Sequence, residues 1–259
     1  MIEKMQTLTL QMPEQSNNMR KLFAYFCLTR KIPAEIVEEL VHQKLLYQSE
    51  NEFTSTSNGQ THKYRNANAV FVHRDQNGTI LGAEIQGCNS SIRYKGVATG
   101  TGDSAFIYTP VPSTKITKAY IFESAIDLMS FYTFCDKSKL PGSVLVSMAG
   151  LKPSVPNALQ AQGIQIYSCV DNDDAGRKFE KDNGFFRPEG VKKFLDQNNF
   201  KDWNELLVFQ TEHPDSIFDK GFHKSDIEEK SLAETTQDVM AENIQNDDDD
   251  IEEMGGMTM

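Results

Sequence analysis

The sequence predicts an α/β fold, with a mainly parallel sheet, flanking helices and a small α+β domain before it. Two observations lead to this prediction. In the second half of the chain, short apolar runs alternate with helix-like segments, which is typical of parallel strands buried on both faces. In the first half, two apolar runs are joined by Asn77-Gly78, a strong signal for a β-hairpin.

The first half reads as a helix followed by strands. Apolar side chains recur at helical spacing over residues 34–47, whereas residues 48–66 are polar and typical of a loop. Strands are expected over residues 69–73 and 79–85, on either side of the Asn-Gly turn. The Gly-, Ser- and Thr-rich residues 86–104 predict a basic loop or a further short hairpin.

The second half repeats a strand followed by a helix. Strands are expected over residues 119–122, 144–147 and 164–170. Glu123 directly follows the first of these strands, and Asp171 directly follows the third. In a parallel sheet the carboxyl ends of the strands share one edge, and the ligand site lies beyond it. We therefore expect Glu123 and Asp171 to lie at the same edge of the sheet.

Charge is unevenly distributed along the chain. The net charge is −11 over 259 residues, but the residues from Lys224 onward hold 12 acidic and two basic side chains. Residues 62–118, in contrast, hold seven Lys or Arg residues and three acidic ones, an excess suited to phosphate groups. The acidic end predicts a disordered tail that binds a basic partner protein, shields the basic region from DNA or only adds solubility.

These changes in composition predict four segments. They are an N-terminal extension over residues 1–29, an α+β domain over 30–115, an α/β domain over 116–215 and an acidic disordered tail over 216–259. Within the extension, residues 19–29 read as a short helix or an apolar docking segment.

Several classes of protein are not predicted. No apolar run has the length of a membrane span and the N-terminus lacks a signal-peptide core, so we expect a soluble cytoplasmic protein. No two cysteines lie at zinc-ligand spacing, which predicts free thiols and no zinc; they are Cys27, Cys88, Cys135 and Cys169. The glycine-rich lysine motif of a P-loop is also missing from the sequence.

The strongest candidate site is Asp171-Asn172-Asp173 together with Glu123. Mg²⁺ prefers oxygen ligands and is usually held by one or two carboxylates and the phosphates of a substrate. Two Asp side chains separated by one residue can converge where the chain turns out of a strand, and Gly176 permits a close approach of the backbone after them. For this motif alone, the alternative is a turn that caps the next helix, since Asp and Asn are favoured N-caps.

These motifs resemble the Toprim domain, which bacterial primases, topoisomerases and some nucleases share. The resemblance implies a Rossmann-like domain with a mainly parallel sheet of about four strands. The resemblance is carried by FESAID (122–127), SMAG (147–150) and VDNDDAG (170–176), and a later Lys-Asp segment of the family is matched by KDWNE (201–205). Ser124 stands where many members of the family have Gly. This difference is expected to change the turn but not the metal site.

The resemblance implies roles for individual residues. Asp171 and Asp173 would bind Mg²⁺, or Mn²⁺ in its place, and Glu123 would be a metal ligand or a general acid or base. Asp202 would be an outer metal ligand, and its alternative is the N-cap of the following helix. Asp127, one helical turn from Glu123, would support the site, or would be a first-turn acid favoured by the helix dipole.

The region before this domain resembles the segment that precedes Toprim in primase cores. It is still more similar to the uncharacterised domain that precedes Toprim in proteins of bacterial conjugative and other mobile elements, through residues 70–83 and 93–96. In relatives the turn after the second strand often carries a basic residue before Gly, where this chain has Gln86-Gly87. Arg93 and Lys95 are candidates for contacts with a triphosphate or a DNA backbone, and an ordinary solvated loop is their alternative.

Together the resemblances imply a primase-like nucleotidyltransferase that uses nucleoside triphosphates on single-stranded DNA, in the replication or transfer of a mobile element. A Toprim nickase or nuclease is the second reading, since the same carboxylates serve either a 3′-hydroxyl or a water molecule as the attacking group. A non-catalytic nucleic-acid-binding accessory protein is the third. A topoisomerase is not expected, because the chain is too short for the domain that supplies the Tyr nucleophile.

Overall fold

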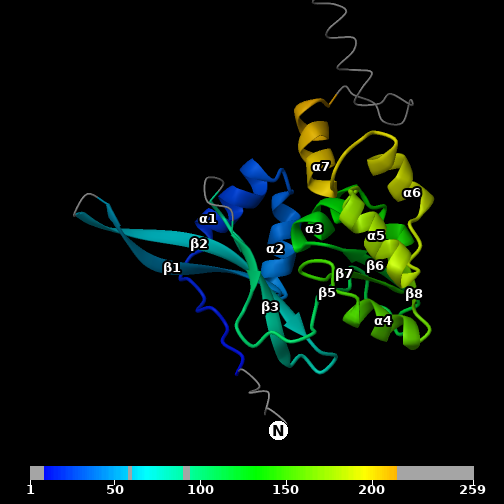
Figure 1. Cartoon of the computed structure of the whole chain (residues 1–259), viewed down its shortest axis with the longest axis horizontal. Helices are drawn as coiled ribbons and strands as arrows, with labels where there is room; N and C mark the ends of the chain where they lie inside the picture. The colour runs from blue at the N-terminus through cyan, green and yellow to red at the C-terminus, as the bar shows by residue number, and fades with distance from the viewer. Residues whose placement is uncertain (1–8, 58–59, 90–93, 215–259) are drawn as a thin grey trace, which may run out of the picture.

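The computed structural model describes residues 9–57, 60–89 and 94–214. These residues form two four-stranded sheets, with strand orders β1-β2-β3-β4 and β5-β7-β6-β8, and helices surround the second sheet (Figure 1). The predicted α/β class, with an α+β region before the main sheet, is confirmed. Arg93 and the acidic tail over residues 216–259 lie outside the described residues.

The first sheet is antiparallel throughout. Its strands are β1 (Leu46–Ser57), β2 (Gln60–Arg74), β3 (Ile80–Gly87) and β4 (Lys95–Val97). The predicted hairpin joins β2 to β3, and Gly78 in its turn has a φ of 82°, a value that favours glycine. β4 pairs with β3, so the segment 86–104 contains the further short hairpin that was one of its two predicted forms.

The polar residues 48–66 were predicted as a loop, and this prediction is wrong because most of them lie in β1 and β2. β2 pairs with β3 only from Asn68 onward, so the outer part of β2 pairs with β1 alone. The two strands extend from the body of the protein as a long ribbon (left in Figure 1). Residues 48–66 lack the alternation of apolar and polar side chains that a strand prediction uses as its signal.

Helical segments precede the first strand. They are α1 (Arg20–Ala24), the π-helical turn η1 (Tyr25–Thr29) and α2 (Ala34–His42). Both expectations for residues 19–29 hold, because the segment is helical and its side chains Leu22 and Phe26 are fully buried in the main core. In α2, Val37 and Leu40 are buried at the helical spacing that predicted this helix.

The second sheet is mainly parallel. At its centre β6 (Lys118–Phe122) pairs in parallel with β7 (Ser143–Ser147) on one side and β8 (Gln165–Ser168) on the other. β5 (Phe106–Tyr108) adds an antiparallel edge to β7. β5 comes from the range expected for the first domain and is too short for its three residues to show a periodicity.

Helices cover both faces of the second sheet. α3 (Ala125–Phe134) and α7 (Trp203–Glu212) pack on one face, against Phe122 and Leu145. Helices α4 (Ser154–Ala161) and α5 (Asp174–Asn183) pack on the other, against Ile121 and Val146. Short segments complete the chain, namely the 3₁₀ turn η2 (Lys137–Lys139), α6 (Glu189–Val191) and the π-helical turn η3 (Lys192–Asp196).

The two sheets share one hydrophobic core. Phe71 of β2 contacts Phe106 of β5 edge-to-face, with 5.4 Å between ring centroids, and Phe26 packs on Phe71 from the helical side. All three rings are fully buried, so this junction fixes the first sheet against the second. None of the helices in the described part of the chain combines the length and the apolar character that crossing a membrane needs.

Candidate active site

The predicted carboxylates come together at the carboxyl edge of the second sheet. Glu123 directly follows β6, and Asp171 lies just beyond β8, which is the paired neighbour of β6. Asp173 and Asp202 lie at the N-termini of α5 and α7. Parallel pairing puts both strand ends at one edge, which is why residues 48 positions apart become neighbours.

Asp171 is the carboxylate most affected by the others. It is 9% exposed, and the pKa of its carboxyl group is raised to about 6, mainly by burial. The negative charges of Glu123, Asp202 and Asp173 contribute to this raised pKa, whereas the Lys201 ammonium group acts in the opposite direction. The four carboxylates therefore lie within electrostatic reach of one another, an arrangement that favours a bound cation or a bound proton.

Lysines supply the positive charge beside these carboxylates. Lys201 Nζ lies 3.5 Å from Asp171 Oδ2 and 3.9 Å from Asp173 Oδ2. Lys95 Nζ, from the first sheet, lies 3.7 Å from Glu123 Oε1. Within the described ranges, no three His, Cys, Asp or Glu side chains converge closely enough to hold a metal ion. The carboxylates are thus arranged around ammonium groups in this structure.

Two of the carboxylates also cap helices. The Gly176 N–H donates to Asp173 Oδ1 at 2.9 Å at the start of α5, and the Glu205 N–H donates to Asp202 Oδ1 at 2.7 Å at the start of α7. The capping alternatives raised from the sequence are therefore realised. Capping uses one oxygen, and the other oxygen of Asp173 faces Lys201. Capping and ligand binding are compatible for this residue.

Gly176 allows α5 to approach the end of β8. A Cβ atom at this position would lie 2.3 Å from the carbonyl oxygen of Asp171, closer than any real contact. Any other residue would push the start of α5 away from the backbone of Asp171. Gly176 therefore supports the placement of both Asp171 and Asp173.

Asp127 lies beneath the site and connects two helices. It is buried, and burial together with the charges of Asp202 and Asp171 raises its pKa well above the usual range. The Ser124 hydroxyl, at the N-cap of α3, donates to Asp127 Oδ2 at 2.5 Å. The Asn204 N–H of α7 donates to Asp127 Oδ1 at 3.4 Å. These contacts hold α3 and α7 together next to the carboxylates.

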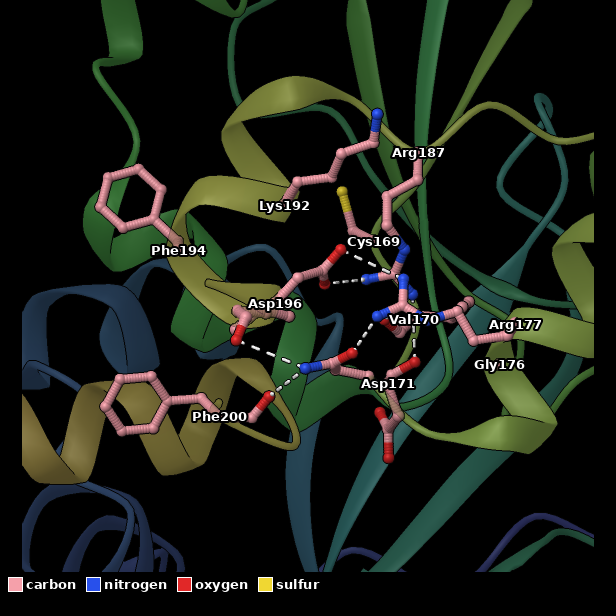
Figure 2. A network of polar contacts seen from close by, with 12 residues as sticks. Cys169, Val170, Asp171, Gly176, Arg177, Arg187, Lys192, Phe194, Asp196 and Phe200 are labelled. Carbon is pink, nitrogen blue, oxygen red and sulfur yellow. Dashed lines mark hydrogen bonds and ion pairs between the residues drawn. The ribbon is translucent and has the colours of Figure 1, made fainter. Parts of the chain in front are cut away.

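Arg187 holds the backbone under Asp171 and was not identified from the sequence (Figure 2). Its Nη2 donates to the carbonyl oxygens of Val170 and Asp171, both at 3.1 Å. Its Nε donates to Glu180 at 2.8 Å, and its Nη1 lies 3.3 Å from Asp196 Oδ1. The Asp171 carboxylate points away from this guanidinium group (Figure 2). Arg187 therefore fixes the strand end without neutralising Asp171 directly.

Asn172, between the two aspartates, ties the motif to the segment before α7. Its amide group donates to the carbonyl oxygens of Leu195 at 3.3 Å and Phe200 at 3.1 Å. Its backbone N–H donates to the carbonyl oxygen of Lys201 at 2.6 Å. The middle residue of the motif thus positions the lysine that faces both aspartates.

The pKa of Asp171 predicts that its carboxylate destabilises the metal-free protein at neutral pH. The pKa is about 6 in the folded protein and about 4 in an unfolded chain, so the stability due to protonation is present below about pH 4 and lost as pH rises through about 6. We expect Asp171→Asn to raise the free energy of unfolding by roughly 1–3 kcal/mol at pH 7.5, and by much less at pH 4. Urea denaturation in the presence of a chelator measures this difference. An equal effect at both pH values would contradict the raised pKa.

Two family models match the chain. One, described as "Protein of unknown function (DUF3991)", matches residues 24–113, and the other, described as "Toprim-like", matches residues 120–207. The second match contains Glu123, Asp171, Asp173 and Asp202.

Two curated relatives also match. An uncharacterized protein of Bacillus anthracis is 28% identical over 208 residues, which cover 70% of this chain and 55% of that protein. A protein of Zymomonas mobilis described as "65 kDa protein" is 28% identical over 156 residues, which cover 54% of this chain and 26% of that protein. The chain thus spans about half of the first relative and about a quarter of the second.

Solved structures with a similar arrangement include primase cores. The primase fragment of the Bacteriophage T7 primase-helicase protein aligns with 70% of this chain and 68% of its own, at 20% identity and a TM-score of 0.43. The E. coli primase catalytic core aligns with 78% of this chain and 63% of its own, at 12% identity and a TM-score of 0.36. The family matches confirm the resemblance expected from the sequence: the chain joins a Toprim-like domain to a preceding DUF3991 domain.

Proposed function

We propose that this protein is a metal-dependent nucleotidyltransferase of the primase type, which joins nucleotides on a single-stranded DNA template. The observation that carries the proposal is the placement of Glu123 and Asp171 at the ends of two paired parallel strands, with Asp173 and Asp202 in electrostatic reach. A cluster of carboxylates at this edge of an α/β sheet suits the handling of phosphate groups through a cation.

The donor set fits Mg²⁺, and Mn²⁺ as its substitute. Carboxylate oxygens are the protein ligands that Mg²⁺ prefers, and the mutual repulsion that raises the pKa of Asp171 would be relieved by a cation. Glu123, Asp171 and Asp173 would hold the metal, with Asp202 as an outer ligand. The Lys201 side chain is 60% exposed, so it can move away from the aspartates when a cation binds.

Individual side chains would have separate roles in the reaction. When bound, the metal would neutralise phosphate charge and favour attack by a 3′-hydroxyl oxygen on the α-phosphate of a nucleoside triphosphate, with pyrophosphate as the leaving group. Glu123 is partly open to solvent and is placed to accept a proton from that hydroxyl group. Lys95, beside Glu123, offers positive charge to a triphosphate or to the template backbone. Arg93 is proposed for the same role, two residues earlier in the chain.

A synthesis assay tests the proposal. The protein is incubated with single-stranded DNA, labelled ribonucleotides or deoxyribonucleotides, and Mg²⁺ or Mn²⁺, next to a parallel reaction with supercoiled plasmid. Template-dependent oligonucleotide synthesis is the expected result. Plasmid nicking without synthesis would overturn it in favour of a Toprim nuclease, and DNA binding without either product would favour a non-catalytic module.

We propose two wider roles, the first from the resemblance and the second from the charge of the chain. The reaction would serve the replication or transfer of a mobile element. The acidic residues 216–259 would bind a basic partner protein, since 12 acidic side chains lie from Lys224 onward.

A further inference from the structure

Glu84, in β3 of the first sheet, is buried and forms hydrogen bonds with residues of α3 and of β7 in the second sheet. Its exposed fraction is 0%. The Ala125 N–H donates to both of its oxygens, at 3.1 and 3.2 Å, and the Ser147 hydroxyl donates to Oε2 at 2.6 Å. Burial raises the pKa of Glu84, and these two hydrogen bonds act in the opposite direction. Burying a carboxylate costs free energy unless the group is hydrogen-bonded in this way. The hydrogen bonds therefore hold Glu84, Ala125 and Ser147 in one arrangement.

Both partners of Glu84 lie beside Glu123. Ala125 begins α3, two residues after Glu123, and Ser147 ends β7, the strand paired with β6. Just beyond β7, the Gly150 N–H donates to the carbonyl oxygen of Glu123 at 2.8 Å. Glu84 therefore connects the two chain segments that hold the backbone of Glu123 from either side.

The same face of the first sheet also supplies Lys95. β3 and β4 pair so that Lys95 lies opposite Gln86 and Val97 lies opposite Glu84, which puts Lys95 and Glu84 on one face. Lys95 Nζ reaches to 3.7 Å from Glu123 Oε1. The strands β3 and β4 thus supply both Glu84, which holds the backbone next to Glu123, and Lys95, whose ammonium group lies beside the Glu123 carboxylate.

We infer that the first sheet is a working part of the active site, and that Glu84 is a positioning residue that holds the start of α3, and with it Glu123, in place. The inference deepens the proposed function and rests on it for the role of Glu123. The region that matches DUF3991 would position one side of the Toprim-like site and supply positive charge to it.

Three variants of the full chain test this. Glu84→Leu leaves two buried donors without an acceptor, whereas Glu84→Gln keeps a carbonyl acceptor of the same shape. Ile85→Ala is the matched control, because Ile85 is the next residue of β3 and is buried on the opposite face, away from the site. Where Glu84→Leu does not fold, Ser147→Ala removes the hydroxyl that donates to Glu84 and accepts from the Ala149 N–H at 3.5 Å, and it is expected to show the same changes at about a third of their size.

The first readout is amide hydrogen exchange of residues 123–128, which does not depend on activity. We expect exchange in Glu84→Leu to be roughly tenfold faster than in the wild type, while Glu84→Gln and Ile85→Ala stay within about twofold. Unchanged exchange in Glu84→Leu, or an equal change in Ile85→Ala, would overturn the positioning role.

The second readout is Mn²⁺ affinity from the electron paramagnetic resonance of the free ion. We expect a loss of roughly tenfold in Glu84→Leu, and recovery in Glu84→Gln. Faster exchange with unchanged Mn²⁺ affinity would overturn the link to the site. If the wild type itself binds no Mn²⁺, the proposed function fails, and the exchange measurement still decides whether Glu84 holds α3.

Discussion

Replacing Asp171 and Asp173 together with Asn is expected to reduce template-dependent nucleotide incorporation by at least about a hundredfold. Several kilocalories of transition-state stabilisation come from a metal in such a site, and each 1.36 kcal/mol is about a factor of ten in rate. Both side chains keep their shape and lose their charge. The Asp173 position can still cap α5, because Asn is as good an N-cap as Asp. Primer-extension products resolved on a gel measure the loss.

The folding of this double variant serves as its control. Removal of the Asp171 charge is expected to stabilise the metal-free protein at neutral pH, so lost activity cannot be attributed to unfolding. Lys201→Ala is a second control, because it removes the positive charge beside the same two aspartates and leaves the carboxylates intact. Incorporation that survives in the double variant would exclude these aspartates from the reaction.

Replacing Arg187 with Met is expected to lower the free energy of unfolding by roughly 3–5 kcal/mol. The Arg187 side chain is 5% exposed and contacts two carboxylates and two backbone carbonyl groups. Met fills a similar volume, but it leaves Glu180 and Asp196 without their shared cation. Chemical denaturation of the variant and the wild type measures the change.

Arg177→Met is the matched control for this prediction. Arg177 also contacts Asp196 (Figure 2), at 3.1 Å, but its side chain is 43% exposed. Water screens such a pair, so we expect a loss below about 1 kcal/mol. Equal losses in the two variants would show that the buried network around Arg187 has no special importance for the fold.

The second sheet and its acidic edge could be predicted because local rules determine them. Continuous apolar runs identify strands that are buried on both faces, and a side chain that directly follows such a strand lies at the carboxyl edge. Glu123 directly follows β6, and Asp171 lies three residues beyond the end of β8, so both lie at this edge. Trp203, at the start of α7, is 2% exposed and donates to the carbonyl oxygen of Cys169 at 3.1 Å.

The supporting contacts could not be predicted, because they join segments that no local pattern connects. Arg187 lies 16 residues from Asp171 in the chain, in a segment without periodicity, and only the fold brings its guanidinium group under the strand end. Glu84 left one signal, a charged residue inside an apolar strand, which requires a partner when buried. That partner lies 41 residues away at Ala125, beyond the reach of any spacing rule.

Mn²⁺ binding to the wild type and to the Asp171→Asn, Asp173→Asn double variant tests the central claim most directly. The acidic tail is present in both proteins, so the difference between them reports on the sheet edge alone. We predict that the wild type binds Mn²⁺ at a site from which Mg²⁺ displaces it. This Mn²⁺ site is expected to be lost in the double variant. Equal Mn²⁺ binding in the two proteins would contradict a metal site at Glu123, Asp171 and Asp173.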